Sequence, residues 1–421
     1  MLLLIHNLIK RTKRGFKMVN KKKNMMYVSN DLGYGAIKGD FDGVSVKQPS
    51  VYTKIFSKPS WENIDLTDNS VVENAVKDIL ENLDVSINDE RFLIGNAAIA
   101  SLKGTVDLQT DSPAGKANGK AAMILPQAYI AGRAIQEAYG REGSDFVVGN
   151  PLQVNVTLVT ALPISESVGE NGEDVRPKYV ERFTQKTHNV IVHSLGEDIV
   201  VGIKFQNVIV LKEGQIAVNS VIKHGNATLS KKLIEEVKKN YPDKAEIADT
   251  LILDSQNYVS IDIGQGTTDM ALISDSAVND ASYSINQGFG DILEDTFNQF
   301  HHPMITKMES FIKVWNGDTD LGDVAEKIDL QIQKNSEALQ TEIISGLTFL
   351  FRKTPTVQVI FVFGGGSVPM VERYHLLERI KDRVNSLQSS AVVVWVGKEK
   401  AQTMNEEALK KISDYLKSQE K

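Results

Sequence analysis

One acidic, glycine-rich segment occurs twice in the chain and constrains its fold more than any other feature. Residues 27–35 read YVSNDLGYG and residues 258–266 read YVSIDIGQG. Tyr, Val, Ser, Asp and both Gly recur in register, with Asp31 and Asp262 separated by 231 positions (262 − 31). A chain of 421 residues is also too long for one ordinary core, so we expect two domains.

The repeated segment has the pattern of an apolar strand, an Asp, a Gly-x-Gly turn and a second strand. Glycines permit positive φ, so successive backbone N–H groups can converge on a phosphate. An Asp at the strand end can hold Mg²⁺, usually through water. Two such turns facing each other would clamp a di- or triphosphate. A third glycine cluster, FVFGGG at 361–366, favours this interpretation over two plain hairpin turns, where Gly and Asp are also common.

Other nucleotide-binding motifs do not fit the sequence. AGKANGKAA lacks the P-loop spacing and has no hydroxyl residue after Lys120. A dinucleotide fingerprint requires a third glycine where GQGTTD has Asp269 and GYGAIK has Lys38. The motifs of protein kinases are absent as well. These classes of nucleotide site are therefore excluded.

Charge is distributed unevenly along the chain. The sequence contains no cysteine, which fits a cytoplasmic location, and its net charge is −7. Residues 1–23 hold eight basic residues and no acidic one, so the remainder carries about −15 (−7 − 8). Such an acidic body argues against direct nucleic-acid binding and favours contact with DNA through a partner.

The N-terminal segment, MLLLIHNLIKRTKRGFKMVNKKK, has two interpretations. Its apolar run precedes its charges, the reverse of a secretory signal, and is too short to span a bilayer. A short membrane-surface helix is one possibility. The interpretation we favour is that residues 1–25 are a disordered or spurious extension, with Met18 as the true start. A membrane partner is not expected.

Strand patterns come first and later alternate with helical ones, which predicts an α/β fold with mixed sheets. The predicted domains are 26–225 with 391–421, and 226–390. Residues 117–139 predict a buried helix that is interrupted near Pro126. EDIVVGIKF and NVIVLKEG predict separate strands, and MVERYHLLERIKDRVNSL predicts one amphipathic helix.

The glycine-rich motifs of the sequence resemble those of a known family. DLGYGAIK and DIGQGTTD are similar to the two phosphate motifs of the actin, Hsp70 and sugar-kinase superfamily, and VFGGGSVP is similar to its adenosine motif. FLIGNAA, MILPQAYIAG, TALPIS and NVIVLKEG further resemble the bacterial ParM (StbA) plasmid-segregation group. The resemblance implies a two-domain actin-like (ribonuclease H-like) fold with a nucleotide cleft between domains.

The resemblance also implies site residues. Asp31 and Asp262 would hold Mg²⁺ through water, and Asp262 would also organise the attacking water. Tyr34 departs from the family pattern, in which smaller residues are usual. The implied nucleotide-binding residues are Asp31, Gly33, Tyr34, Gly35 and Lys38 in the first motif, Gly264, Gln265, Gly266, Thr267 and Thr268 in the second, Gly364, Gly365, Gly366 and Ser367 in the third, and Asp291 after INQGFG.

Glu213 is the second predicted catalytic residue, in addition to Asp262. Family members place Glu or Gln between an apolar strand and a helix, and NVIVLKEGQIAVNSV puts Glu213 there. Phosphate hydrolysis needs an oriented water, and a carboxylate can accept a hydrogen bond from it. The alternative is an acid that complements the dipole at a helix start.

Two pairs of residues that include histidine are weaker candidates for a metal site. His301 and His302 are adjacent, and neighbouring side chains on a helix point apart. His375 and Glu378 would share a helix face, but one pair without further ligands indicates a surface contact. We therefore expect no protein-held metal cluster at either pair.

Three functions would use the same nucleotide-hydrolysing core. The expected one is a dynamic homopolymeric filament that segregates plasmid or phage DNA through a DNA-bound adaptor. The alternatives are a membrane-associated filament of the rod-shape type and a non-polymerising ATPase or kinase. The C-terminal 51 residues after the third motif (421 − 370) are too few for a chaperone's substrate-binding region. The sequence does not distinguish ATP from GTP.

Overall fold

The computed structural model describes residues 25–56, 68–108, 115–143, 151–169, 172–275 and 277–419. The chain divides into unit 1, formed by Met1–Leu162, Glu166–Lys212 and Glu406–Lys421, and unit 2, formed by Pro163–Ser165 and Glu213–Asn405. The chain passes from unit 1 to unit 2 after residue 212 and returns to unit 1 after residue 405. The sequence prediction put these two boundaries after residues 225 and 390. Except for Met25, the predicted N-terminal extension lies outside the described residues.

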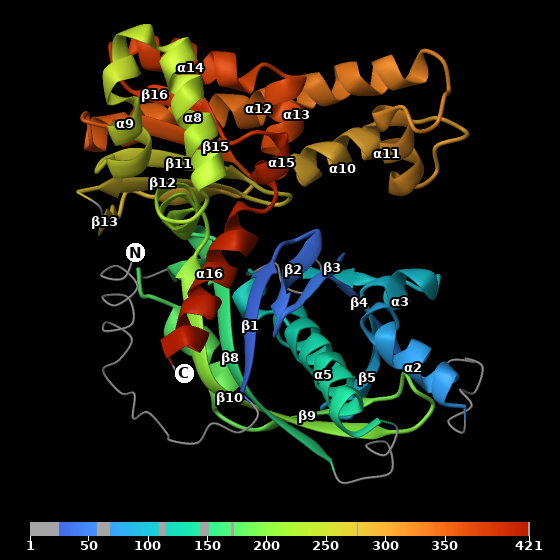
Figure 1. Cartoon of the computed structure of the whole chain (residues 1–421). Coiled ribbons are helices and arrows are strands. Elements are labelled where there is room, and N and C mark those ends of the chain that lie inside the picture. The colour runs from blue at the N-terminus through green and yellow to red at the C-terminus, as the bar shows by residue number, and fades with distance from the viewer. Residues whose placement is uncertain are drawn as a thin grey trace. The chain divides into compact units, whose positions relative to one another are not determined.

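Unit 1 is built on a mixed sheet with the strand order β3-β2-β1-β8-β10-β9-β5-β6-β4-β7. Helix α5 packs across this sheet and buries residues around its whole circumference (Figure 1). The strands are β1 (Met25–Leu32), β2 (Ala36–Phe41), β3 (Val44–Pro49), β4 (Val51–Ile55), β5 (Asp84–Ile87), β6 (Glu90–Ile94), β7 (Val106–Asp107), β8 (Leu152–Leu162), β9 (His188–Val192) and β10 (Ile199–Lys212). The helices are α2 (Asn69–Lys77), α3 (Asn96–Ala100), α5 (Ala121–Glu142), α6 (Arg176–Thr184) and α16 (Met404–Gln419), of which α16 starts in unit 2.

Unit 2 is built on a smaller mixed sheet with the order β13-β12-β11-β15-β16, with β14 paired to β12. Its strands are β11 (Tyr258–Ile263), β12 (Thr268–Ser274), β13 (Ala277–Val278), β14 (Tyr283–Ile285), β15 (Val359–Phe363) and β16 (Val392–Trp395). Its helices are α7 (Gln215–Ala217), α8 (Ala227–Asn240), α9 (Ala248–Asp254), α10 (Phe289–Gln299), α11 (Met308–Asn316), α12 (Val324–Lys353), α13 (Ser367–Glu372), α14 (Leu376–Ser386) and α15 (Lys398–Ala401). A π-helical turn, Val218–Lys223, follows α7.

The two units share one sheet topology. In unit 1, β1 pairs antiparallel with β2 and parallel with β8, which pairs parallel with β10. In unit 2, β11 pairs antiparallel with β12 and parallel with β15, which pairs parallel with β16. Each repeated sequence segment thus contains the third strand in the order of its own sheet. Every residue of β11 and β15 is buried, as expected for strands covered on both faces.

Helix α5 is continuous, and the predicted interruption near Pro126 is wrong. Pro126 has no N–H to donate to the carbonyl of Ala122, one helical turn earlier. The hydroxyl of Tyr179, from α6, donates to that carbonyl at 3.4 Å. The side-chain donor replaces the missing backbone bond, so the helix passes through the proline.

Two other local predictions are corrected. β10 is one strand with a register shift between Phe205 and Asn207, because a bulge joins the two predicted strands. The predicted helix over 370–387 is broken into α13 and α14 at His375, whose φ is +57°. Gln340 of α12 donates to the carbonyl of Tyr374 at 3.1 Å and takes that acceptor from the helix.

Each unit has its own apolar core. In unit 2, one side of the long helix α12 supplies Val324, Ile328, Ile332, Leu339, Ile343 and Leu347, which recur at helical spacing. In unit 1, α5 packs its Ala, Ile and Leu residues against the sheet. None of the helices in the described part of the chain combines the length and apolar character that crossing a bilayer requires.

Candidate functional site

The first glycine turn, Gly33–Ala36, connects β1 to β2 in unit 1. Its closing bond runs from the Gly33 N–H to the Ala36 carbonyl at 3.1 Å. Asp31 and Lys38 face each other across the hairpin, because they are register partners. The structure therefore places all five predicted residues of the first motif, from Asp31 to Lys38, in one hairpin.

Ser50 holds this turn from within unit 1. Its side chain is fully buried, its hydroxyl donates to the Gly33 carbonyl at 2.7 Å, and its N–H donates to the Gly35 carbonyl at 3.3 Å. In a trans peptide the N–H points opposite to the carbonyl, so the group joining Gly33 to Tyr34 directs its N–H away from Ser50.

The second glycine turn, Gly264–Thr267, connects β11 to β12 in unit 2 and repeats the same bond. The Gly264 N–H donates to the Thr267 carbonyl at 2.8 Å, at positions offset by 231 from the first turn (264 − 33). Asp262 and Asp269 are register partners, as Asp31 and Lys38 are in unit 1. The sequence repeat is thus a repeat of backbone geometry.

The glycines of these two turns act differently from the prediction. Gly33 and Gly264 do not have positive φ; a Cβ on either would lie 3.1 Å from the carbonyl that closes its turn. Glycine is favoured there because the turn closes tightly. Positive φ occurs in the third cluster, at Gly364, where φ is +90°.

The third glycine cluster follows β15 and lies against Asp262. β15 runs parallel to β11, and the Gly366 N–H donates to the Ile263 carbonyl at 2.8 Å. A Cβ on Gly364 would lie 2.4 Å from Asp262 Oδ1, so only glycine leaves room for that carboxylate. Ser367 is fully buried; its hydroxyl donates to the Gly364 carbonyl at 2.7 Å and accepts from Trp395 at 3.0 Å.

Glu213 is the first residue of the main segment of unit 2. It directly follows β10 and is 9% exposed. The next residue, Gly214, has a φ of +70°, and its carbonyl accepts a 2.9 Å hydrogen bond from the Ser260 hydroxyl on β11. A Cβ on Gly214 would lie 3.7 Å from the Cβ of Asp262. The backbone next to Glu213, at Gly214, therefore lies against Asp262 of β11.

The start of α10 is bound to the second glycine turn. The N–H groups of Phe289 and Gly290 donate to the carbonyls of Gly264 and Gln265, at 3.0 and 2.8 Å. The carboxylate of Asp291 accepts from the Gly288 N–H at 2.7 Å, as in a helix cap. Thr268 donates from its hydroxyl to the carbonyl of Gln287 at 2.9 Å. Asp291, Gln265 and Thr268 thus hold the turn against the helix.

Sequence reasoning missed two polar residues of unit 2, Asn405 and Asp269. Asn405 donates from its side-chain amide to Asp262 Oδ2 at 2.6 Å. Asp269 is 2% exposed and accepts from the Ile164 N–H at 2.8 Å and from the Ser284 hydroxyl at 2.5 Å. Asp269 was visible in the motif GQGTTD, whereas no local pattern marks Asn405.

A third missed residue, Glu406, lies near the first motif in unit 1. Burial raises the pKa of its carboxyl group, and the negative charge of Asp31 raises it further, while Lys38 and Lys47 act in the opposite direction. The C-terminal helix α16 therefore adds an acid to the hairpin of Asp31 and Lys38. Neutralising cations would be favoured at such a pair of carboxylates.

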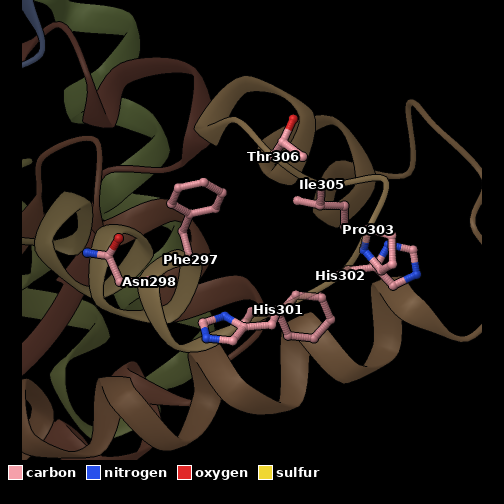
Figure 2. A pocket seen from close by; sticks show the side chains of 8 residues that line it. Phe297, Asn298, His301, His302, Pro303, Ile305 and Thr306 are labelled. Carbon is pink, nitrogen blue, oxygen red and sulfur yellow. The ribbon is translucent and has the colours of Figure 1, made fainter.

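The histidine candidates lie outside the helices that the sequence analysis expected for them. His301 and His302 come after the end of α10 rather than on a helix, and they line a cavity of about 600 Å³ with Phe297, Pro303 and Ile305 (Figure 2). His375 precedes α14, so the predicted shared helix face with Glu378 is wrong. Among the described residues, no group of three or more His, Asp or Glu side chains is arranged to hold a metal ion.

Comparison with known proteins shows the fold. Neither a protein-family model nor a curated protein sequence matches the chain. The actin-like protein Alp7A matches with a TM-score of 0.60 at 17% identity, over 94% of this chain and 98% of that one. An archaeal actin homologue gives 0.55 at 17%, over 94% and 100%, and apo pSK41 ParM gives 0.53 at 16%, over 94% and 99%. The chain has the actin-like fold, which confirms the fold predicted from the sequence.

Proposed function

We propose that this chain is an actin-like, Mg²⁺-dependent nucleotide hydrolase of the ParM group. It polymerises into dynamic filaments, which segregate plasmid or phage DNA through a DNA-bound adaptor protein. One observation carries the proposal: each unit closes the same glycine turn directly after a strand whose second-last residue is an acid, Asp31 in β1 or Asp262 in β11. A turn of this kind can present backbone N–H groups to phosphate, and we infer that both turns do so.

Printed descriptions of proteins with this fold support nucleotide binding and assembly. One archaeal actin homologue of similar fold is described in complex with ADP, at a TM-score of 0.52. ParM from Bacillus thuringiensis is described with ATP, at 0.51. A pCBH ParM is described as a non-polymerisable quadruple mutant, at 0.55. By likeness of fold we extend nucleotide binding and self-association to this chain.

The donor set fits Mg²⁺ better than a more demanding metal. Mg²⁺ keeps several waters and is held by one or two carboxylates together with substrate phosphates. Asp31 and Asp262 are the carboxylates that would hold it, and the described residues contain no larger ligand group. When bound, the cation would neutralise charge on phosphate oxygens. Asn405, bound to Oδ2, fixes the orientation of the Asp262 carboxylate.

Three further residues would have separate roles in hydrolysis. Glu213 is a buried residue, next to Gly214 which lies against Asp262, and its carboxylate would accept a hydrogen bond from the attacking water. Gly364 leaves room for the Asp262 carboxylate, because a Cβ there would lie 2.4 Å from Oδ1. Lys38, in unit 1, would contribute positive charge to phosphate.

The test is right-angle light scattering of the full chain after addition of Mg-ATP or Mg-GTP, with phosphate release measured in parallel. We expect scattering to rise with nucleotide and to decay as phosphate appears, and the nucleotide that produces this behaviour is the preferred one. Asp262→Ala serves as the control and should release no phosphate.

Two outcomes would contradict parts of the proposal. Phosphate release with flat scattering at all protein concentrations would indicate a non-polymerising relative. Wild-type turnover in Asp262→Ala would remove Asp262 from the site. The DNA adaptor is tested separately, by asking whether pelleted filaments carry a plasmid only when its DNA-binding partition protein is added.

A further inference from the structure

The first glycine turn is held by a second group of contacts, which involves residues that no motif contains. The hydroxyl of Tyr34, inside the turn, donates to Glu166 Oε1. The other oxygen of this carboxylate, Oε2, accepts from the N–H of Lys116 at 2.6 Å. One carboxylate therefore joins the turn to the segment that starts at Gly115. We call Tyr34, Lys116 and Glu166 the brace.

Lys116 closes the brace from the other side of the turn. Its side chain is 1% exposed, and its Nζ donates to the carbonyl of Leu32, directly before the turn, at 2.9 Å. The same Nζ lies 5.4 Å from the centre of the Tyr34 ring. A buried ammonium is costly unless polar groups surround it, so these contacts fix its position closely.

The local sequence around Lys116 is built to admit Glu166. Gly115 has a φ of +96°, and a Cβ there would lie 2.8 Å from Glu166 Oε2. Arg182 of α6 donates to the carbonyl of Ala117 and, at 2.8 Å, to that of Gly119. The segment that presents Lys116 is therefore itself anchored, and the brace connects the turn to a fixed support.

We propose that Glu166 is a positioning residue for nucleotide binding: through Tyr34 and Lys116 it holds the first glycine turn in the conformation that receives phosphate. This inference rests on the function proposed above. Ser50 holds the Gly33 and Gly35 carbonyls, and the brace holds the Leu32 carbonyl and the Tyr34 side chain. A turn fixed in advance loses less conformational entropy on binding, which increases affinity.

Neutralising Glu166 should change nucleotide affinity in opposite directions depending on whether its charge or its positioning role dominates. A carboxylate near phosphate weakens anion binding by repulsion, so neutralising Glu166 would strengthen binding if its charge dominated. If positioning dominates, neutralising it weakens binding. The proposal commits to the second outcome. It also accounts for tyrosine in the turn, because a smaller side chain at position 34 would not reach Glu166.

The test uses the full chain and compares Tyr34→Phe, Glu166→Gln and Glu166→Ala with wild type. The dissociation constants of Mg-ADP and Mg-ATP are measured by calorimetry, and KM and kcat by phosphate release. Glutamine keeps one acceptor oxygen for two donors, so we expect the dissociation constant to rise about threefold in Glu166→Gln and about tenfold in Glu166→Ala and Tyr34→Phe. KM should follow the dissociation constant, with a smaller change in kcat.

The matched controls are Glu181→Gln, at an exposed position on α6, and Tyr139→Phe, on α5, and both should bind nucleotide as wild type does. Unchanged binding in folded Tyr34→Phe, or tighter binding in Glu166→Gln, would overturn the brace and leave the proposed function standing. A wild-type chain that binds no nucleotide would overturn both. If Glu166→Ala does not fold, Tyr34→Phe, which removes one oxygen atom, decides the question.

Discussion

Asn405 donates a 2.6 Å hydrogen bond to Asp262 Oδ2, joining the first turn of α16 to the end of β11 across 143 positions of sequence. The carboxylate of Asp262 is thus fixed on one oxygen by Asn405, and its other oxygen faces Gly364. This arrangement resembles the outer hydrogen bonds that orient metal-binding carboxylates in other proteins.

Replacing Asn405 should therefore impair the reaction without removing any group that contacts nucleotide. We expect Asn405→Ala to reduce kcat/KM by about tenfold and to raise the Mg²⁺ concentration needed for half-maximal rate. Asn405→Asp should be worse, because it sets two carboxylates against each other. Phosphate release across a Mg²⁺ titration measures both, and an unchanged Mg²⁺ dependence in both variants would contradict the role.

Glu213→Ala should slow hydrolysis by about 100-fold, because the attacking water loses its hydrogen-bond acceptor. Nucleotide affinity should stay close to that of wild type, and filaments should last longer. Glu213→Gln keeps an acceptor oxygen and should retain more activity than Glu213→Ala. Single-turnover phosphate release compares the two, and equal rates in wild type and Glu213→Ala would reduce Glu213 to a helix-end acid.

Gly364→Ala should destabilise unit 2 by about 2 kcal/mol, because Gly364 has a φ of +90° and a Cβ would meet Asp262 Oδ1 at 2.4 Å. Gly365→Ala is the matched control: the nearest atom to its Cβ, 3.4 Å away, belongs to the flexible side chain of Gln402. Urea unfolding of both variants measures the difference. Equal losses of free energy of unfolding would refute the steric argument.

His188 should make the folded chain sensitive to mild acid. Burial lowers the pKa of its imidazole below 6.5, although the Phe183 carbonyl, 2.9 Å from Nε2, acts in the opposite direction. The unfolded state then binds more protons as the pH falls below about 6.5, so this contribution to stability is present above that pH and decreases below it.

Glutamine at position 188 does not titrate and keeps an N–H for the Phe183 carbonyl. His188→Gln should therefore lose less free energy of unfolding than wild type between pH 7 and pH 5. Urea unfolding at both values measures the loss, with His301→Gln, at an exposed position, as the control. An equal pH dependence in wild type and His188→Gln would show that protonation of His188 does not affect the free energy of unfolding.

The fold and the motif residues were predictable because they leave local patterns. Buried strands such as β11 and β15 are uniform apolar runs, and a tight turn after Asp262 requires glycine, so both appear in a single stretch of sequence. The repeat at Asp31 and Asp262 marks the corresponding strands β1 and β11 of the two units.

The contacts that hold the site in place were not predictable, because each joins distant segments. Asn405 reads as an ordinary residue of an amphipathic helix, and Glu166 as part of a polar loop. The continuity of α5 at Pro126 likewise depends on Tyr179, which lies 53 positions away (179 − 126) and offers only a hydroxyl. Local propensity cannot reveal a donor that tertiary packing supplies.

Helix α16 also sets an order for synthesis and folding. Unit 2 comes from a nearly continuous stretch of chain, but unit 1 uses α16, which docks on the β2–β3 hairpin through Lys410 to Asp40 at 3.1 Å and Lys417 to Asp42 at 2.7 Å. A ribosome adds α16 only after all of unit 2 has been made. The unit that is begun first is therefore completed last. In a nascent chain, unit 1 cannot be complete until α16 has emerged from the ribosome.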